Sequence, residues 1–215
     1  MKHIAHIENG FDSKFAVPRQ AGLADTEGRI VFEKEYRDRE AVRGLEGFSH
    51  IWIIWETSES ITEEFSPTVR PPRFGGNTRM GVFATRSPFR PNPIGLSCVR
   101  LEEIDYDDSL GPVLKVRGSD LMNGTPIYDI KPYVPYADCK LDATEGYATR
   151  PDESLVVEFE CEVPEQIKKD LKEILKLDPR PRYQEDGREY GFSYKGHEIK
   201  FYVEKDKVKV KDISD

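Results

Sequence analysis

The sequence predicts a mainly β protein, with an antiparallel β-barrel domain followed by a small α+β domain. Before about residue 140 it contains five or six short apolar runs, separated by Gly, Pro, Asn and Asp as strands are separated by turns. After about residue 149 the pattern changes to a strand, one amphipathic helix and further strands. We therefore expect a barrel domain over 1–145 and an α+β domain over 150–215.

The barrel strands are expected at regular intervals along the first 122 residues. They are predicted at 3–9, 29–36, 49–57, 80–87, 95–106 and 113–122. The run SHIWIIWET is almost continuously apolar, as in a strand that is buried on both faces. In the last strand, alternation places Val113 and Lys115 on one face and Leu114 and Val116 on the other. Such closely spaced short strands favour a closed barrel.

The second domain is expected to begin with a strand at 155–163 and a helix at 164–178. Apolar residues recur every three or four positions along this helix, at Ile167, Leu171, Ile174 and Leu175. A proline lies near each end, where helices commonly begin and stop. Two further strands, 190–196 and 197–213, are expected on either side of a turn at Lys195 and Gly196.

The charge distribution is uneven. The formal net charge of −8 argues against a general nucleic-acid binder, because phosphate contacts need clustered Lys and Arg. Between Glu64 and Glu102, however, there is no Asp or Glu. The arginines of this interval are Arg70, Arg73, Arg79, Arg86, Arg90 and Arg100. The acidic chain thus carries one locally cationic tract.

Several classes of protein and site are not expected. The three cysteines are far apart and form no CxxC pair, and the four histidines join no ligand cluster, so we expect neither a disulfide framework nor a metal site. No stretch approaches the roughly 20 apolar residues of a membrane span, and the start MKHIAHIENG lacks the order of a secretory signal, so a cytoplasmic location is expected. Walker, GxGxxG, GxSxG and HExxH motifs are absent from the sequence.

The segment from Pro71 to Ser97 combines five prolines, four glycines and most of these arginines. Proline stiffens a loop, and glycine lets the backbone approach a ligand closely. Arginine offers a planar, permanently charged fork that suits phosphate and carboxylate. The segment is therefore a candidate anion site. The alternative is a long loop whose arginines pair with surplus carboxylates of the chain.

Two further clusters carry possible chemistry. In LMNGTPIYDIKPYVPYAD a turn signal is followed by Asp129, Lys131 and Tyr133, which share one face if the segment is extended. An acid, an ammonium and a phenol together could transfer protons or hold a polar substrate, or they could be a surface ion pair beside a packed Tyr. Near the N-terminus, Arg19 and Gln20 follow a proline in SKFAVPRQAG.

At these clusters the sequence resembles the TsaA-like or YaeB-like family, the TrmO type of tRNA methyltransferase. The matching stretches are KFAVPRQAG, AVRGLEGFSHIWI, PPRFGGNTRMGVFATRSPFRPNPIGLS, NGTPIYDIKPYVP and, more weakly, DPRPRY. The resemblance implies an enzyme that uses S-adenosylmethionine (S-adenosyl-L-methionine), built on an antiparallel β-barrel and acting as a homodimer. It also implies the family's reaction, methylation of N6 of N6-threonylcarbamoyladenosine at position 37 of tRNA.

The resemblance carries over a set of cofactor-binding residues. They are Arg19, Gln20, Ser58, Glu59, Arg86, Leu96, Asn123, Gly124, Thr125 and Pro126. Ser58 and Glu59 stand where proteobacterial members have a His-Gln pair. Asn123 replaces an Asp of some members, which keeps a carbonyl acceptor and loses the charge.

The same resemblance suggests roles in the reaction. Asp129 is the candidate base that accepts the N6 proton, and Lys131 and Tyr133 are candidate groups for orienting the threonylcarbamoyl substituent. Residues assigned to tRNA or to the substrate carboxylate are Arg73, Arg79, Arg90 and Asn92. Two alternatives remain open: a module that binds S-adenosylmethionine or an anion without catalysis, and a methyltransferase with a different acceptor.

Overall fold

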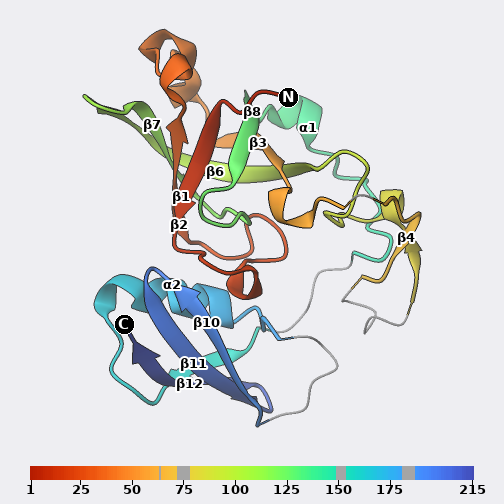
Figure 1. Cartoon of the computed structure of the whole chain (residues 1–215), viewed down its shortest axis with the longest axis vertical. Helices are drawn as coiled ribbons and strands as arrows, with labels where there is room; N and C mark the ends of the chain where they lie inside the picture. The colour runs from red at the N-terminus through yellow and green to blue at the C-terminus, as the bar shows by residue number, and fades with distance from the viewer. Residues whose placement is uncertain (63, 72–77, 149–153, 181–186) are drawn as a thin grey trace.

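The computed structural model describes residues 1–62, 64–71, 78–148, 154–180 and 187–215. Its N-terminal part is a closed barrel in which the strands follow the order β1-β2-β7-β6-β3-β8, and every neighbouring pair is antiparallel (Figure 1). These strands are β1 (Ala5–Asn9), β2 (Glu27–Phe32), β3 (His50–Glu56), β6 (Ile94–Asp107), β7 (Gly111–Arg117) and β8 (Pro126–Pro132). The predicted mainly β barrel is confirmed.

Alternation along the strands fills the barrel. In β6 Val99 and Leu101 are buried in the barrel core, whereas Leu96 is 55% exposed on the outer face. In β3 Ile51 and Ile53 are fully buried in the same core. Since successive side chains of a strand point to opposite faces, each strand presents one row to the core and one to the outside.

Three of the predicted barrel strands differ from the structure. The prediction over 80–87 is wrong beyond residue 81: β5 (Met80–Gly81) pairs only with the short β4 (Thr68–Val69), and a 3₁₀ helix follows. The carbonyl of Val82 is bonded instead by the amide of Thr85 and by the guanidinium of Arg90, so this segment has no barrel partner. The predictions over 29–36 and 113–122 extend beyond the ends of β2 and β7.

The barrel instead closes with β8, a segment that the sequence does not predict as one of the barrel strands. A register shift at Ile54 and Trp55 marks an irregularity where β8 pairs with β3. Among the described residues, the short helices are α1 (Pro135–Asp138) and the 3₁₀ helices Lys14–Ala16, Lys34–Tyr36, Arg39–Val42, Leu45–Gly47, Ser58–Ser60 and Val82–Ala84.

The C-terminal part is a four-stranded sheet, in the order β10-β11-β12-β9, with one helix. Its elements are β9 (Val156–Phe159), α2 (Glu165–Leu175), β10 (Glu189–Tyr194), β11 (His197–Glu204) and β12 (Lys207–Ser214). The predicted helix is confirmed, and all four of its periodic apolar residues are buried. The single strand predicted over 197–213 is wrong, because the chain turns at Lys205, which has a positive φ of 56°.

The two parts share apolar contacts. Phe11 and Ala16, from the connection after β1, belong to the core formed by α2 and the C-terminal sheet. Phe11 pairs with Tyr194 through a β-bridge, and their rings are 5.4 Å apart. A Cβ on Gly10 would lie 2.6–2.8 Å from side-chain atoms of Lys195 and Tyr194, so only glycine allows this close approach. The connection after β1 therefore contributes to the C-terminal core, which is separate from the barrel core, and the division at 1–145 and 150–215 stays a prediction.

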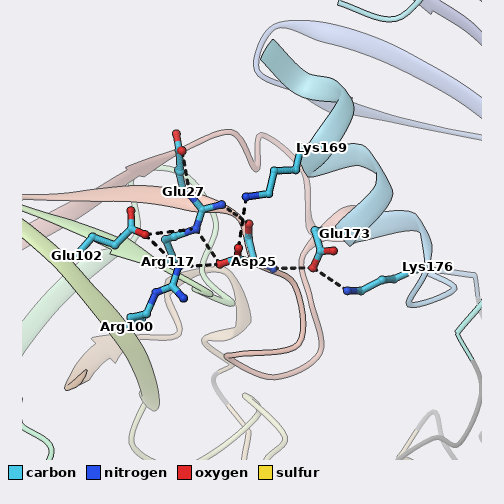
Figure 2. Close-up of polar contacts among 8 residues, drawn as sticks. All are labelled: Asp25, Glu27, Arg100, Glu102, Arg117, Lys169, Glu173 and Lys176. Atoms are coloured by element: carbon cyan, nitrogen blue, oxygen red, sulfur yellow. Dashed lines mark hydrogen bonds and ion pairs between the residues drawn. The ribbon is translucent and has the colours of Figure 1, made fainter. Parts of the chain in front are cut away.

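A polar network joins the same surfaces (Figure 2). The side chain of Arg117, only 8% exposed, donates to the Asp25 carboxylate at 2.7 Å and to Glu27 at 2.9 Å. From α2, Glu173 accepts the Asp25 amide at 3.1 Å and Lys169 lies 3.6 Å from the Asp25 carboxylate. The hydrogen bond from Arg117 holds the pKa of Asp25 below its usual value. The barrel end is thereby tied to α2.

Candidate functional site

Three connections between barrel strands lie at one end of the barrel. Because neighbouring strands are antiparallel, the ends of β1, β3 and β7 lie beside the starts of β2, β6 and β8. The connections at this end are β1–β2 (10–26), β3–β6 (57–93) and β7–β8 (118–125). Every predicted cofactor residue lies in one of them or at the start of β6 or β8. The C-terminal part packs against the first connection at the same end (Figure 1).

The side chains of Gln20 and Arg86 meet although they are 66 positions apart in sequence. A guanidinium nitrogen of Arg86 donates to Oε1 of Gln20 at 2.5 Å. The neighbouring Arg19 reaches the C-terminal part, where its Nη2 donates to the carbonyls of Asp178 at 3.3 Å and Arg180 at 3.1 Å. The structure therefore brings together the PRQ motif (18–20) and the ATRS motif (84–87), which are far apart in the sequence.

The predicted turn at Asn123 to Pro126 lies against the end of β1. The amide of Asn9 donates to Oδ1 of Asn123 at 3.1 Å, and the amide of Gly124 donates to the carbonyl of Ile7 at 2.8 Å. Gly124 has a φ of 77°, in the region that glycine adopts without strain. Nδ2 of Asn123 also donates to Asp12 at 3.5 Å, a bond that an Asp at this position could not form. Thr125 is buried, and Pro126 begins β8.

Ser58 and Glu59 belong to the 3₁₀ helix Ser58–Ser60, just after β3. Nζ of Lys14, from the β1–β2 connection, donates to the carbonyl of Glu59 at 2.7 Å and lies 3.8 Å from its carboxylate. This contact ties the first two connections together. Thr57 precedes this helix. Its hydroxyl donates to the carbonyl of Pro88, and its amide donates to the carbonyl of Pro93.

Leu96 links this end of the barrel to the candidate catalytic residues. It pairs with Ile54 of β3, and Ile54 pairs with Asp129 of β8, so the three residues form one row across neighbouring strands. Leu96 and Asp129 are two strand spacings apart, roughly 9–10 Å. The structure therefore places Asp129 on the face of the β-sheet that carries Leu96.

The three candidate catalytic residues lie on one face, as predicted. The carboxylate of Asp129 is 3.0 Å from Nζ of Lys131, and both side chains are about half exposed or more. Tyr133 follows the end of β8, and its ring packs 5.8 Å from Trp52 and 6.2 Å from His50. This arrangement is also that of a surface ion pair beside a packed Tyr, so the catalytic roles remain predictions.

The candidate tRNA-binding residues have different surroundings. Arg79 is exposed just before β5, and it donates to the Thr68 hydroxyl at 3.0 Å. The guanidinium of Arg90 donates hydrogen bonds to the carbonyls of Val82 and Thr85 and lies over the Phe83 ring. Some of its hydrogen-bond donors therefore stabilise the local turn. Asn92 is exposed. Arg73, like Arg182 and Tyr183 of the DPRPRY stretch, lies outside the described residues.

The structure also places Asp120, which sequence reasoning did not select, among these residues. Its Oδ1 accepts a hydrogen bond from the Ser97 hydroxyl at 2.5 Å, and Ser97 in turn accepts one from the Trp55 indole at 2.9 Å. Burial raises the pKa of Asp120 above its usual value, and the Ser97 bond, the Ala21 amide and the Arg86 charge offset only part of this effect. Its position three residues before Asn123 was the available sequence signal.

Comparison with known proteins identifies the family. The model of the tRNA-methyltransferase O N-terminal domain matches residues 6–139, and that of the TrmO C-terminal domain matches residues 153–215. The chain belongs to the TrmO family. The chain is 44% identical, over 90% of its length and 86% of the relative's, to a protein of Escherichia coli (strain K12) named tRNA (adenine(37)-N6)-methyltransferase.

Other TrmO relatives are similar over nearly the whole chain. A putative S-adenosylmethionine-dependent methyltransferase of Pseudomonas aeruginosa is 38% identical over 98% of this chain and 96% of its own. A crystal structure of TrmO superposes with a TM-score of 0.81 at 33% identity, covering 99% of this chain and 97% of the other. The TrmO assignment therefore rests on both parts of the chain.

The described residues contain neither a candidate metal cluster nor a candidate membrane-spanning helix. Within the described ranges, no group of three or more His, Cys, Asp and Glu side chains could hold a metal ion. Across those same ranges, no helix is both long and apolar enough to cross a membrane.

Proposed function

We propose that the protein transfers a methyl group from S-adenosylmethionine to N6 of N6-threonylcarbamoyladenosine at position 37 of tRNA. Membership of the TrmO family supports the coarser activity, methylation of adenine-37 in tRNA with S-adenosylmethionine. The single structural observation that carries the proposal is the meeting of Gln20 and Arg86 at the barrel end that also carries the turn at 123–126.

The charges at this end suit the cofactor. S-adenosylmethionine combines a carboxylate with two cationic groups, and it supplies an electrophilic methyl group when bound. Arg19 and Arg86 offer guanidinium groups for the carboxylate, and Asn123 offers amide and backbone groups for the adenosine part. Leu96 provides an exposed apolar surface near the start of β6, at the same end of the barrel. The donor set therefore fits a ligand of mixed charge with an aromatic base.

The protein's contribution to the reaction is orientation and proton transfer. The acceptor N6 is a poor nucleophile while its lone pair is delocalised into the neighbouring carbonyl. Asp129 accepts the N6 proton, and Lys131 and Tyr133 orient the threonylcarbamoyl group. The row from Leu96 through Ile54 to Asp129 supports this assignment, because it puts the base on the same face as a cofactor residue.

The acid-free tract is the proposed contact for the tRNA backbone. Arg70 directly follows β4 and Arg79 directly precedes β5, so both exposed arginines lie at the end of this hairpin where its two strands are connected. Guanidinium groups without nearby carboxylates attract phosphate even in a chain of net negative charge. We assign Arg73, Arg79, Arg90 and Asn92 to this contact or to the substrate carboxylate.

The test is mass spectrometry of nucleosides from tRNA of a strain that lacks this protein. The proposal expects loss of N6-methyl-N6-threonylcarbamoyladenosine and its return when the gene is restored. Persistence of this nucleoside would contradict the proposal. Purified protein with S-adenosylmethionine and modified tRNA separates the alternatives, because a binding module would bind the cofactor without methylating RNA.

Cellular location and assembly are part of the same proposal. A tRNA-modifying enzyme meets its substrate in the cytoplasm, and the family resemblance implies a homodimer. Light scattering on the purified protein tests the second statement, and a monomeric mass at micromolar concentration would contradict it.

A further inference from the structure

Asp120 is held by a directed chain of hydrogen bonds. The Trp55 indole N–H can only donate, so the oxygen of Ser97 accepts from it. The Ser97 hydroxyl proton is then directed to Oδ1 of Asp120. That oxygen must accept, and the chain therefore fixes Oδ1 of Asp120 at a defined position.

The surroundings of Asp120 come from all the segments of the candidate site. Ser97 follows Leu96 in β6, and the Ala21 amide, which donates toward Asp120, follows Gln20. The charge of Arg86 acts on the carboxylate from the β3–β6 connection. Asp120 itself precedes the turn at 123–126.

The charge of Asp120 lacks a bonded cation. Asp25 has Arg117 at 2.7 Å, and Glu59 has Lys14 at 3.8 Å. Across the part of the chain that the structure describes, no Lys, Arg or His nitrogen forms an ion pair with Asp120, and the Arg86 guanidinium bonds to Gln20 instead. A mostly buried carboxylate without a cationic partner is unfavourable. A cationic ligand would remove this penalty.

We propose that Asp120, oriented by Ser97 and Trp55, binds the methylsulfonium group of S-adenosylmethionine. The inference rests on the proposed function, in which this end of the barrel binds that cofactor. Transfer of the methyl group leaves a neutral thioether, so the attraction to Asp120 ends with the reaction. Asp120 thus makes the site selective for the substrate form of the cofactor over its product, S-adenosylhomocysteine, and favours exchange of product for substrate.

Because the sulfonium is positive before transfer and loses its charge during it, Asp120 stabilises the bound cofactor rather than the transition state. Substitution should therefore raise the KM for S-adenosylmethionine with a much smaller effect on kcat. A raised KM with a nearly unchanged kcat distinguishes a cofactor-binding residue from one that accepts the N6 proton.

The test is calorimetric titration of the full chain with S-adenosylmethionine, S-adenosylhomocysteine and sinefungin, which carries an amine in place of the sulfonium. Asp120→Asn should weaken binding of the two cationic ligands by about 10-fold, with S-adenosylhomocysteine changed by less than about 2-fold, as expected for loss of one close charge pair. The matched control is Asp108→Asn, an exposed acid in the turn at the opposite end of the barrel. It makes the same change in net charge and should leave all three affinities unchanged.

Each result is informative. Equal weakening of all three ligands, or none, would overturn the inference while leaving the proposed function intact. Absence of S-adenosylmethionine binding by the unsubstituted protein would instead contradict the proposed function.

Ser97→Ala is the second variant, in case Asp120→Asn does not fold. It keeps the carboxylate but removes a hydrogen bond that lowers the pKa of Asp120, so more of this acid is protonated at mildly acidic pH. The groups that still lower the pKa of Asp120 in this variant are its own backbone amide, the Ala21 amide and the Arg86 charge. Preference for S-adenosylmethionine over S-adenosylhomocysteine should fall at pH 6 and recover toward pH 8. A preference equal to that of the unsubstituted protein at both pH values would overturn the inference.

Discussion

At the scale of single residues, the site is ordered by side chains that already bond one another. Arg86 donates to Gln20, and the guanidinium carries five N–H donors in all. A partly bonded guanidinium is held in one orientation, and its remaining donors can meet an anionic ligand with little further loss of entropy. The PRQ motif is similarly fixed by the bonds from Arg19 to the C-terminal carbonyls.

The role of Asp129 is tested by Asp129→Asn. We expect the single-turnover rate of methyl transfer to fall by about 10²–10⁴-fold, as for loss of a general base, with S-adenosylmethionine affinity unchanged. Rapid-quench measurement with modified tRNA provides the rate. Asp105→Asn, an exposed acid further along β6, is the matched control. A rate equal to that of the unsubstituted protein would show that Asp129 is not the base.

At the scale of elements, β3 and β6 together position the site. Gly95 pairs with Trp55, and an added Cβ would lie 2.2–2.6 Å from atoms of its indole ring. The absence of a side chain at Gly95 therefore lets the indole lie where it bonds Ser97. One strand pair thus supports both the exposed Leu96 and the buried hydrogen-bond chain to Asp120.

Gly95→Ala should displace the Trp55 ring. We expect the free energy of unfolding to fall by about 1–3 kcal/mol, as in an overpacked core, and S-adenosylmethionine to bind more weakly. Urea denaturation and calorimetry provide the two values. Gly47→Ala is the control, because a Cβ there meets nothing within 4 Å. Unchanged stability and affinity in Gly95→Ala would contradict this account.

Some secondary-structure elements could be predicted from the sequence, whereas others depend on pairing with distant segments. The helix at 165–175 followed from its apolar period, because that signal is local. The segment 82–87 has strand-like composition but no partner strand, and Arg90 stabilises a turn there instead. The strand at 126–132 contains two prolines and alternates weakly, yet pairing with β1 and β3 makes it part of the barrel.

At the scale of the whole molecule, the candidate site is bordered by the C-terminal part. The Asp25 network and the packing of Phe11 join the β1–β2 connection to α2 and to β10. That connection carries Arg19 and Gln20. The C-terminal part is therefore expected to hold the PRQ motif in place.

Asp25→Asn tests this connection through stability. The pKa of Asp25 is lowered, so its contribution is present above the unfolded value of 3.8 and is lost as the pH falls below it. At pH 7 we expect the free energy of unfolding to fall by only about 1–2 kcal/mol, since this carboxylate is 41% exposed and partly screened. The difference should shrink toward pH 3 in urea denaturation. A difference that grows on acidification would contradict the network.

The proposed tRNA contact belongs to the same scale. Arg79→Gln should weaken tRNA binding and reduce the slope of log affinity against log salt by about 1, with S-adenosylmethionine affinity unchanged. Arg79 is preferred to Arg90 because Arg90 also stabilises the local turn. Filter binding over a salt series measures the slope. Arg43→Gln, in the connection after β2, is the control of equal charge, and an unaltered slope in Arg79→Gln would exclude this contact.

The sequence by itself determined the features that depend on neighbouring residues. These include the apolar periods of most strands and of α2, the acid-free arginine tract and the motifs that indicated the family. The tertiary structure decided what depends on distant pairing: closure of the barrel by β8, the meeting of Gln20 with Arg86, and the chain from Trp55 through Ser97 to Asp120. Local patterns report which face of a strand is apolar, but strand pairing sets which loops meet at the barrel end.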